Sequence, residues 1–313
     1  MYGYILKRIA AAVPVFAMVG LFVFSLLFVA PGDPAAIVAG DQATDADIAR
    51  IRAAMGLDRP FLVQLGEWFW RLLHGDLGNS IFNSLPVMQL IQNRIGPTLS
   101  LMSVTLLIAI AVAVPLGVTA ASRAGTWLDR GIMALAVLGF STPVFVLGYV
   151  LSFSVSLKLG WLPVQGYTPL ERGLWPWLRN LILPAVSLGF IYIALIARVT
   201  RAAMLEVLQQ DYIRTAQAKG LAQRTVLYLH ALKNASVPIA TAIGIGVALL
   251  IGGAVVTESV FAIPGLGRLT VDAILQRDYP VIQGVVLVCS FTYVLVNLLV
   301  DLLYGVLDPR IRY

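Results

Sequence analysis

Asp211–Pro238 reads DYIRTAQAKGLAQRTVLYLHALKNASVP, a polar stretch between two runs that are each apolar enough to cross a bilayer. Its first half, up to Lys219, has good helix formers, with an acid at its start and a base at its end. Gly220 follows, where a residue in the left-handed conformation ends a helix. A second helix is expected from about Gln223 to Asn234. The stretch is therefore predicted to be a helical hairpin between two transmembrane segments.

Six apolar segments lie along the chain on either side of this hairpin, and they determine the fold class. The chain has 313 residues, of which 59% are hydrophobic and only 12% charged, a composition typical of an integral membrane protein. A bilayer core about 30 Å thick needs roughly 20 apolar residues of helix. The sequence thus predicts an all-α membrane protein with six transmembrane helices. The expected spans are Ile9–Ala30, Thr98–Ser122, Gly131–Leu157, Leu181–Ala203, Val237–Phe261 and Val281–Leu307.

The positions of Lys and Arg predict that both chain ends lie on the inner side of the membrane (N-in, C-in). In that orientation the inner segments hold twelve of the 22 basic residues and five acids, whereas the outer side has nearly equal numbers of both. An excess of basic residues marks inner loops, although long loops are largely exempt. The first span follows Lys7 and Arg8, but it is too long for a signal peptide and is interpreted as a retained anchor. The positive net charge needs no nucleic acid to explain it.

The chain is predicted to have four parts. These are residues 1–30 with the first span, an outer helical connection 31–97, a core of five spans 98–307 that includes the inner loop 204–236, and a tail 308–313. In the outer connection, Thr44 and Asp47 have capping-box spacing, and Gly56 and Gly75 each follow an amphipathic stripe. A third amphipathic stretch is Pro86–Arg94. Three interpretations of these short helices remain open: they lie on the membrane face, pack on a partner or cap the outer mouth.

Residues within the third span, at the outer end of the fifth span and in the turn after it are candidates for a transport pathway or gate. Ser141 and Thr142 precede a proline that breaks the third span, and the Thr142 hydroxyl is placed to rebond the freed carbonyl. Glu258 lies in the last turn of the fifth span, where the outer interface is expected to hydrate it. It suits either a gate or a local hydrogen bond. The turn that follows is expected to be re-entrant and to be shaped by Pro264, Gly265 and Gly267.

The polar hairpin has the chemistry of a docking surface. Small residues such as Thr215 and Ala216 let a helix sink into a groove, while Arg214 and Lys219 fix its register. The alternative is a helix that lies on anionic headgroups of membrane lipid. The residues alone leave both partners open.

Beyond these physical signals, the stretch resembles the EAA-type cytoplasmic loop of ABC importer permeases, in particular the dipeptide/oligopeptide (nickel) branch. The loop glycine matches Gly220, and the nominal Glu-Ala-Ala falls on Arg214–Ala216, where one of the three letters holds. His230, Asn234 and Pro238 match this branch's own version. Other matches occur in order along nearly the whole chain: LKRI, PGDP, GDLGNS, PTLSL, STPVF, GWLPVQGY, TESVFAIPGLGRL, RDYP and LDPRIR.

The resemblance implies a type I importer permease with the MetI-like fold in the bacterial inner membrane. Its implied partners are a homologous second permease, two cytoplasmic ATPase subunits, an extracytoplasmic substrate-binding protein and a peptide substrate. Relatives in this branch also carry nickel, glutathione or other small solutes, and these stay alternatives. The residues implied in ATPase coupling are Asp211, Arg214, Thr215, Ala216, Lys219, Gly220, His230 and Asn234.

The sequence contains no motif for ATP hydrolysis, for a cofactor or for a metal. None of its four lysines stands in a G-x-x-x-x-G-K-[ST] motif, and no His, Cys and Asp cluster has metal-ligand spacing. An ion-coupled secondary transporter normally buries acids or histidine in mid-membrane, whereas Glu258 and Asp301 lie toward the ends of spans. The chain is therefore expected not to be an enzyme, and the energy for transport is expected to come from other subunits.

Overall fold

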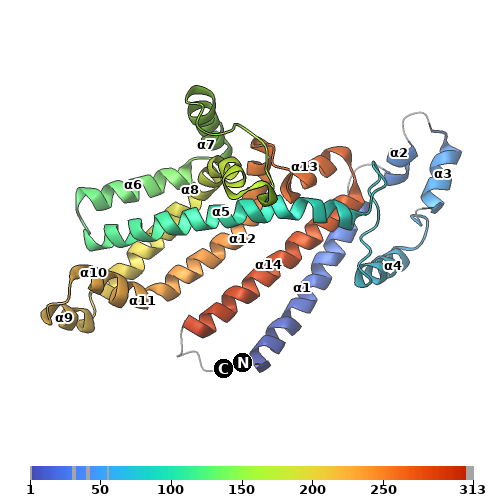
Figure 1. Cartoon of the computed structure of the whole chain (residues 1–313). Helices are drawn as coiled ribbons and strands as arrows, with labels where there is room; N and C mark the ends of the chain where they lie inside the picture. Colours follow the sequence, from blue (N-terminus) through green and yellow to red (C-terminus); the bar gives the residue numbers. More distant parts are fainter. Residues whose placement is uncertain (1, 30–32, 40–42, 55, 308–313) are drawn as a thin grey trace. The chain divides into compact units, whose positions relative to one another are not determined.

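The computed structural model describes residues 2–29, 33–39, 43–54 and 56–307. In these residues the secondary structure is helical apart from one isolated β-bridge between Asn79 and Pro86 (Figure 1). Five helices are long and apolar enough to cross a membrane, and a bent pair of helices adds a sixth span if it is counted as one. The predicted all-α membrane fold is confirmed. The predicted turn at PGDP lies partly outside the described residues, and the predicted tail 308–313 lies entirely outside them.

The helices form two units, and each is described separately. The first unit contains Met1–Gly96 and Arg268–Val294, and the second contains Pro97–Gly267 and Leu295–Tyr313. The first holds α1 (Tyr2–Val29), α2 (Pro34–Ala39), α3 (Asp45–Ala54), α4 (Phe61–Leu73), most of α13 (Leu266–Gln276) and the first residues of α5 (Val87–Ser122) and α14 (Tyr279–Leu307). The second holds the rest of α5, α6 (Trp127–Ser141), α7 (Val144–Leu151), α8 (Leu174–Leu208), the hairpin helices and α12 (Ser236–Val260).

In the outer connection, α3 begins after Thr44, and α3 and α4 end before Gly56 and Gly75, as the sequence predicts. The Asp47 amide donates to Thr44 Oγ1 over 3.3 Å, and the Thr44 amide donates to Asp47 Oδ2 over 3.3 Å, which is a capping box. The Thr44 hydroxyl also donates to Asp47 Oδ2, over 2.7 Å. The hydrogen bond from the Thr44 side chain holds the pKa of Asp47 below its ordinary value. Gly56 and Gly75 follow α3 and α4 with φ of 69° and 77°, a conformation that is inexpensive only for glycine.

Three helix predictions need correction. Pro86–Arg94 is not a separate helix, because its residues are the first turns of α5, which continues through Pro97. The second correction is α2, a helix that was not predicted. The third is α13, which is a helix where only a turn was expected. Its signal was an apolar stripe whose residues Leu266, Leu269 and Ala273 are buried.

Two motifs of the first unit are joined by a buried carboxylate. Asp278, in the RDYP motif, is 3% exposed, and its Oδ2 accepts a 2.5 Å hydrogen bond from the hydroxyl of Ser80 in GDLGNS. Its Oδ1 accepts the amide of Ile81 over 3.2 Å. A buried carboxylate needs donors of this kind. These bonds fix the loop after α4 to the start of α14.

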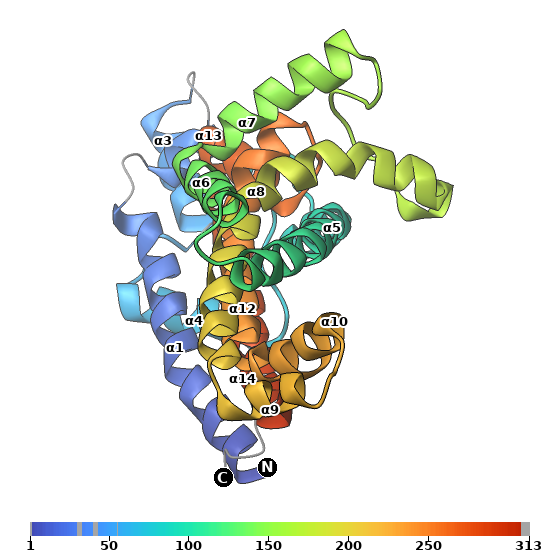
Figure 2. The ribbon, with the colours of Figure 1, turned by 90° about the vertical axis from the view of Figure 1, so that its left-hand side faces the viewer.

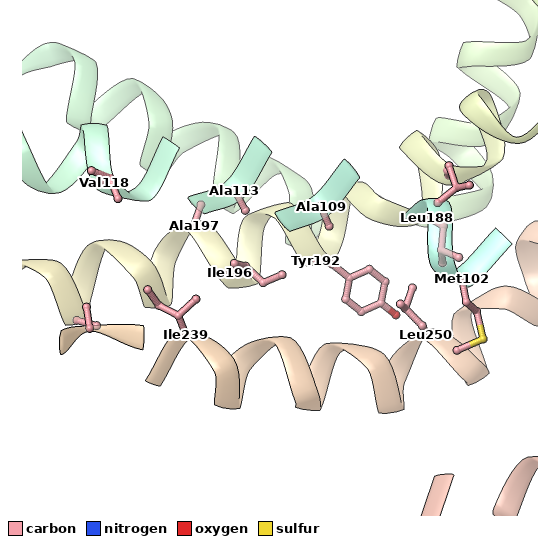
Figure 3. Packing of buried hydrophobic residues seen from close by; sticks show 14 of the residues in the cluster. Met102, Ala109, Ala113, Val118, Leu188, Tyr192, Ile196, Ala197, Ile239 and Leu250 are labelled. Carbon is pink, nitrogen blue, oxygen red and sulfur yellow. The ribbon is translucent and has the colours of Figure 1, made fainter. Parts of the chain in front are cut away.

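The core of the second unit is built around α8. Buried residues of α5, such as Ala109 and Ala113, meet Tyr192 and Ile196 of α8, and Ile239 and Leu250 of α12 contact the same cluster (Figure 3). Without water between the helices, close packing drives their association, and small residues allow it. The helix backbones accordingly approach closely at glycines: a Cβ at Gly117 would lie 2.5 Å from Thr200 Cβ, and one at Gly253 would lie 2.8 Å from a Leu188 methyl.

The third predicted span is sharply bent. The helix Trp127–Ser141 and the helical segment Val144–Lys158, in which a π-helix (Ser152–Lys158) continues α7, meet at 104°. Pro143 caps α7 at the bend, as expected for a proline that breaks a helix. The Thr142 hydroxyl donates to the Leu138 carbonyl over 2.8 Å. It therefore bonds back to its own helix, but not to the Gly139 carbonyl, whose amide partner the proline removes.

An ion pair joins α6 to α8 in the second unit. Arg201 Nε and Nη2 donate to the two carboxylate oxygens of Asp129 over 2.5 and 2.7 Å, and the Gly125 amide donates to Oδ2 over 2.9 Å. Asp129 is 3% exposed. Both oxygens of the buried carboxylate are therefore satisfied, and the bidentate geometry fixes the register of the two helices.

Substituting Gly117 by alanine should destabilise the second unit. The new methyl would lie 2.7 Å from the Ala197 carbonyl oxygen as well as 2.5 Å from Thr200, and overpacking of this kind costs about 1–3 kcal/mol. The matched control is Gly131→Ala, because nothing lies within 4 Å of a Cβ there. Thermal unfolding in detergent measures both variants. Equal midpoints for the two would contradict the close approach of α5 and α8.

Candidate functional site

The inner hairpin begins two residues after α8 ends. Its first helix, α9 (Asp211–Ala218), is followed by Lys219 and then by Gly220 with a φ of 76°. The Gly220 amide donates to the Gln217 carbonyl over 2.9 Å, and the Leu221 amide donates to the Ala216 carbonyl over 3.4 Å. These two bonds form a Schellman motif. The predicted left-handed stop at Gly220 is confirmed, and it gives α9 a defined end.

The second half of the hairpin is helical over the predicted range but not uniformly α-helical. It consists of α10 (Gln223–Thr225), a π-helix (Val226–Ala231) and α11 (Leu232–Asn234). The Asn234 side-chain amide donates to the His230 carbonyl over 2.8 Å. Both residues therefore act within this helix: His230 through its backbone, and Asn234 as a cap at its end.

One face of α9 is buried and the other is open. Ile213 is fully buried and Ala216 is 9% exposed, and both join the core cluster together with Val226 and Ala231 of the second half. This packing holds the hairpin against the ends of α8 and α12 that adjoin it in the chain (Figure 2). Ala216, which the sequence suggested for an outward docking face, instead supports the hairpin from within.

The open face of α9 carries the remaining predicted coupling residues. Asp211 and Arg214 have side chains that are 97% and 73% exposed, and they form a 3.5 Å ion pair one turn apart. Pairs of this kind between exposed side chains contribute little to stability. Thr215, Lys219 and Gly220 are exposed as well. The helix α9 is therefore packed on the core through its buried face, and its exposed face of small and charged residues is available for contact with a partner.

The outer candidate residues form a second cluster in the same unit. Glu258, which the sequence places in a hydrated position, is instead fully buried. Thr98 Oγ1 donates to its carboxylate over 2.6 Å and accepts the Leu266 amide over 2.8 Å. A buried carboxylate at the end of a span is thus tied to the start of α13 through one hydroxyl.

Glycines make room for this carboxylate. A Cβ at Gly265 would lie 2.2 Å from the carboxyl carbon of Glu258, and one at Gly267 would lie 2.5 Å from Val255 Cα. Pro264 and Gly265 belong to the turn after the fifth span, whereas Gly267, which was expected to shape the turn, lies in the first turn of α13. The re-entrant course of the turn stays a prediction. Ser141 and Thr142 are not part of this cluster, because their hydroxyls bond within α6.

A third segment completes the end of α12. Gln165 and Gly166, in the GWLPVQGY motif, donate to the last carbonyls of the span, Val260 and Phe261, over 3.1 and 2.9 Å. The sequence offered no sign of this contact, because nothing in it pairs segments 95 residues apart. The end of the fifth span is therefore held by polar groups from several segments of the second unit.

Substitutions at Gly265 and Glu258 should be strongly non-additive. Gly265→Ala should destabilise the protein because its methyl overlaps the Glu258 carboxyl group. In a Glu258→Ala background the methyl has room, so the same change should cost less, with a coupling of about 0.5–3 kcal/mol. Unfolding of the four proteins in detergent gives the double-mutant cycle. Additive effects would show that the two groups do not meet.

Comparisons with known proteins show the family of the chain. Residues 113–313 match the model of the family described as binding-protein-dependent transport system inner membrane component, and residues 1–102 match an N-terminal model of such membrane components. Over 99% of both chains, the protein is 52% identical to a probable peptide ABC transporter permease protein, y4tP, of Sinorhizobium fredii. It is 40% identical to the dipeptide transport system permease protein DppB of Escherichia coli K12, over 100% of this chain and 99% of the other.

Solved structures show the same fold. A chain from inward-facing structures of the MetNI methionine ABC transporter is 20% identical and matches with a TM-score of 0.60, over 71% of this chain and 97% of its own. The helical membrane fold thus recurs in a solved transporter. With family models that match along most of its length, this chain belongs to the inner membrane components of binding-protein-dependent transport systems.

Proposed function

We propose that this chain is a permease subunit of an ATP-driven importer for dipeptides or oligopeptides, and that α9 is its coupling helix. The observation that carries the coupling role is the two-sided nature of α9: Ile213 and Ala216 are buried in the core, while Arg214, Thr215 and Lys219 face outward. The peptide substrate rests on relatives named as peptide and dipeptide permeases. Nickel, glutathione or another small solute remains the alternative substrate.

Force applied to α9 would reach the spans through packed side chains. The core cluster that holds Ile213 also contains Met204 near the inner end of α8 and Ile239 near the start of α12. Close-packed interiors have low compressibility and transmit strain. The Schellman motif at Gly220 satisfies two of the last carbonyls of α9 and gives the helix a defined end. A movement of the docked helix would therefore shift α8 and α12 together instead of being absorbed in the hairpin.

This proposal requires specific partners. Two cytoplasmic ATPase subunits would supply the motion, one on this chain and one on a homologous second permease, and an extracytoplasmic binding protein would deliver the peptide. The open face of α9 suits a groove in an ATPase subunit, since small residues permit close approach and flanking charges fix the register. At the opposite end of α12, the hydrogen bonds among Glu258, Thr98 and Leu266 would hold the outer end of α12 and the start of α13 together while the inner end of α12 moves.

Reversing charge on the open face should weaken ATPase binding without unfolding the permease. Arg214→Glu combined with Lys219→Glu changes two exposed side chains, so the thermal midpoint should stay unchanged while the ATPase recovered with the purified permease falls several-fold. The matched control is Lys233→Glu, an exposed residue of α11, which should keep ATPase recovery near that of the unaltered protein. Undiminished recovery with the double reversal would count against α9 as the docking helix.

Transport itself is tested by reconstitution. The permease pair, its ATPases and its binding protein in proteoliposomes should accumulate a labelled dipeptide only when ATP is present, and peptide-loaded binding protein should stimulate ATP hydrolysis. Nickel and glutathione serve as competing substrates. If all subunits are assembled and hydrolyse ATP, yet no peptide enters, the peptide assignment is wrong. Accumulation of a competing solute would then identify the substrate class.

A further inference from the structure

The helix α4 of the outer connection lies beside the membrane-spanning part of α1. A Cβ at Gly20 would come within 2.9 Å of the Phe69 ring, and the rings of Phe24 and Trp68 are 5.5 Å apart. At the other end of α4, the Phe61 ring is 5.1 Å from that of Phe28. These contacts lie within the apolar span Ala10–Val29. The contacts of α4 are therefore at membrane depth and not above the membrane.

The depth of α4 follows from helix geometry. Gly20 lies nine residues before Val29, where the span ends, so the Phe69 contact is about 13 Å of helix below that end at 1.5 Å per residue. Phe61 lies opposite the last turn of the span. Helix α4 therefore occupies the outer half of the apolar layer and descends from Phe61 toward Phe69.

The side chains of α4 divide into three faces. Phe61, Trp68 and Phe69 pack on α1. The polar side chains Gln64, Glu67 and Arg71 line a cavity of about 230 Å³ in the first unit. The remaining face carries large apolar side chains that no other part of the described chain covers: Leu62 is 77% exposed, Val63 45%, Trp70 65% and Leu73 79%.

We propose that α4 is an interfacial helix whose exposed apolar face is covered by acyl chains of the outer leaflet of the membrane. Three observations favour lipid over a protein partner or water. The helix lies at the depth of acyl chains, its apolar and polar faces are on different sides, and Trp70 has the amphipathic ring that is typical of a membrane interface. Four large apolar side chains lie exposed together on this face, and contiguous exposed apolar patches mark surfaces that contact a membrane or another molecule.

Spin labels at single cysteines test this in the complete importer reconstituted into phospholipid bilayers. In a Cys289→Ala background, labels are placed at Leu62→Cys, Gly66→Cys and Leu73→Cys. A Cβ at Gly66 meets nothing within 4 Å, so a label there leaves the packing intact. The two reference sites are Val13→Cys, an exposed position in the span of α1, and Arg50→Cys, an exposed position of α3.

Lipid-covered labels should collide often with oxygen and rarely with a water-soluble nickel chelate. At all three α4 sites, the oxygen collision rate divided by the nickel-chelate collision rate should approach the value at Val13→Cys. It should exceed the value at Arg50→Cys several-fold. A ratio close to that at Arg50→Cys would overturn the proposal, because the face would then be in water. Low collision rates with both reagents would overturn it as well, because a protein partner would then cover the face.

Discussion

The close approach of other helices to α8 is the constraint on which the second unit depends. In the interior of a membrane the hydrophobic effect does not hold helices together, so contact between their surfaces must do so. Glycines make this contact possible on several sides of α8: Gly117 brings α5 against Thr200, Gly139 brings α6 within 2.9 Å of Ala194, and Gly253 brings α12 against Leu188. The hairpin inherits its rigidity from this core, since its buried residues belong to the same cluster.

Buried polar groups then fix the ends of the helices. Asp129 pairs with Arg201 where α6 begins, Glu258 accepts the Thr98 hydroxyl where α12 ends, and Asp278 holds Ser80 at the start of α14. A buried polar group without a partner is costly, so each contact admits essentially one arrangement of its segments. Packing along the spans and hydrogen bonds at their ends therefore have separate roles: packing permits the helices to meet, and the hydrogen bonds determine their register.

What could be predicted from sequence was mostly local. The stop at Gly220 and the capping box at Thr44 depend on residues a few positions apart, and both were correct. Five spans followed from apolar length alone. The burial of Glu258 was missed because it depends on Thr98, 160 residues away, and the inward position of Ala216 was missed because a small residue suits a core as well as a docking face. The helix α13 was missed because Pro264 and Gly265 before it and Gly267 in its first turn suggested a turn, although a short apolar stripe follows them.

The bend after α6 has a consequence for the surrounding bilayer. With 15 residues, α6 is about 22 Å long at 1.5 Å per residue, whereas the hydrocarbon layer of a typical bilayer is about 30 Å thick. The chain then turns by 104° instead of continuing across. Lipid beside α6 must become thinner, at a modest elastic cost for each ångström of hydrophobic mismatch, unless another protein surface takes its place. The tilt of α6 should therefore depend on membrane thickness, because longer and shorter acyl chains favour different tilts of this helix.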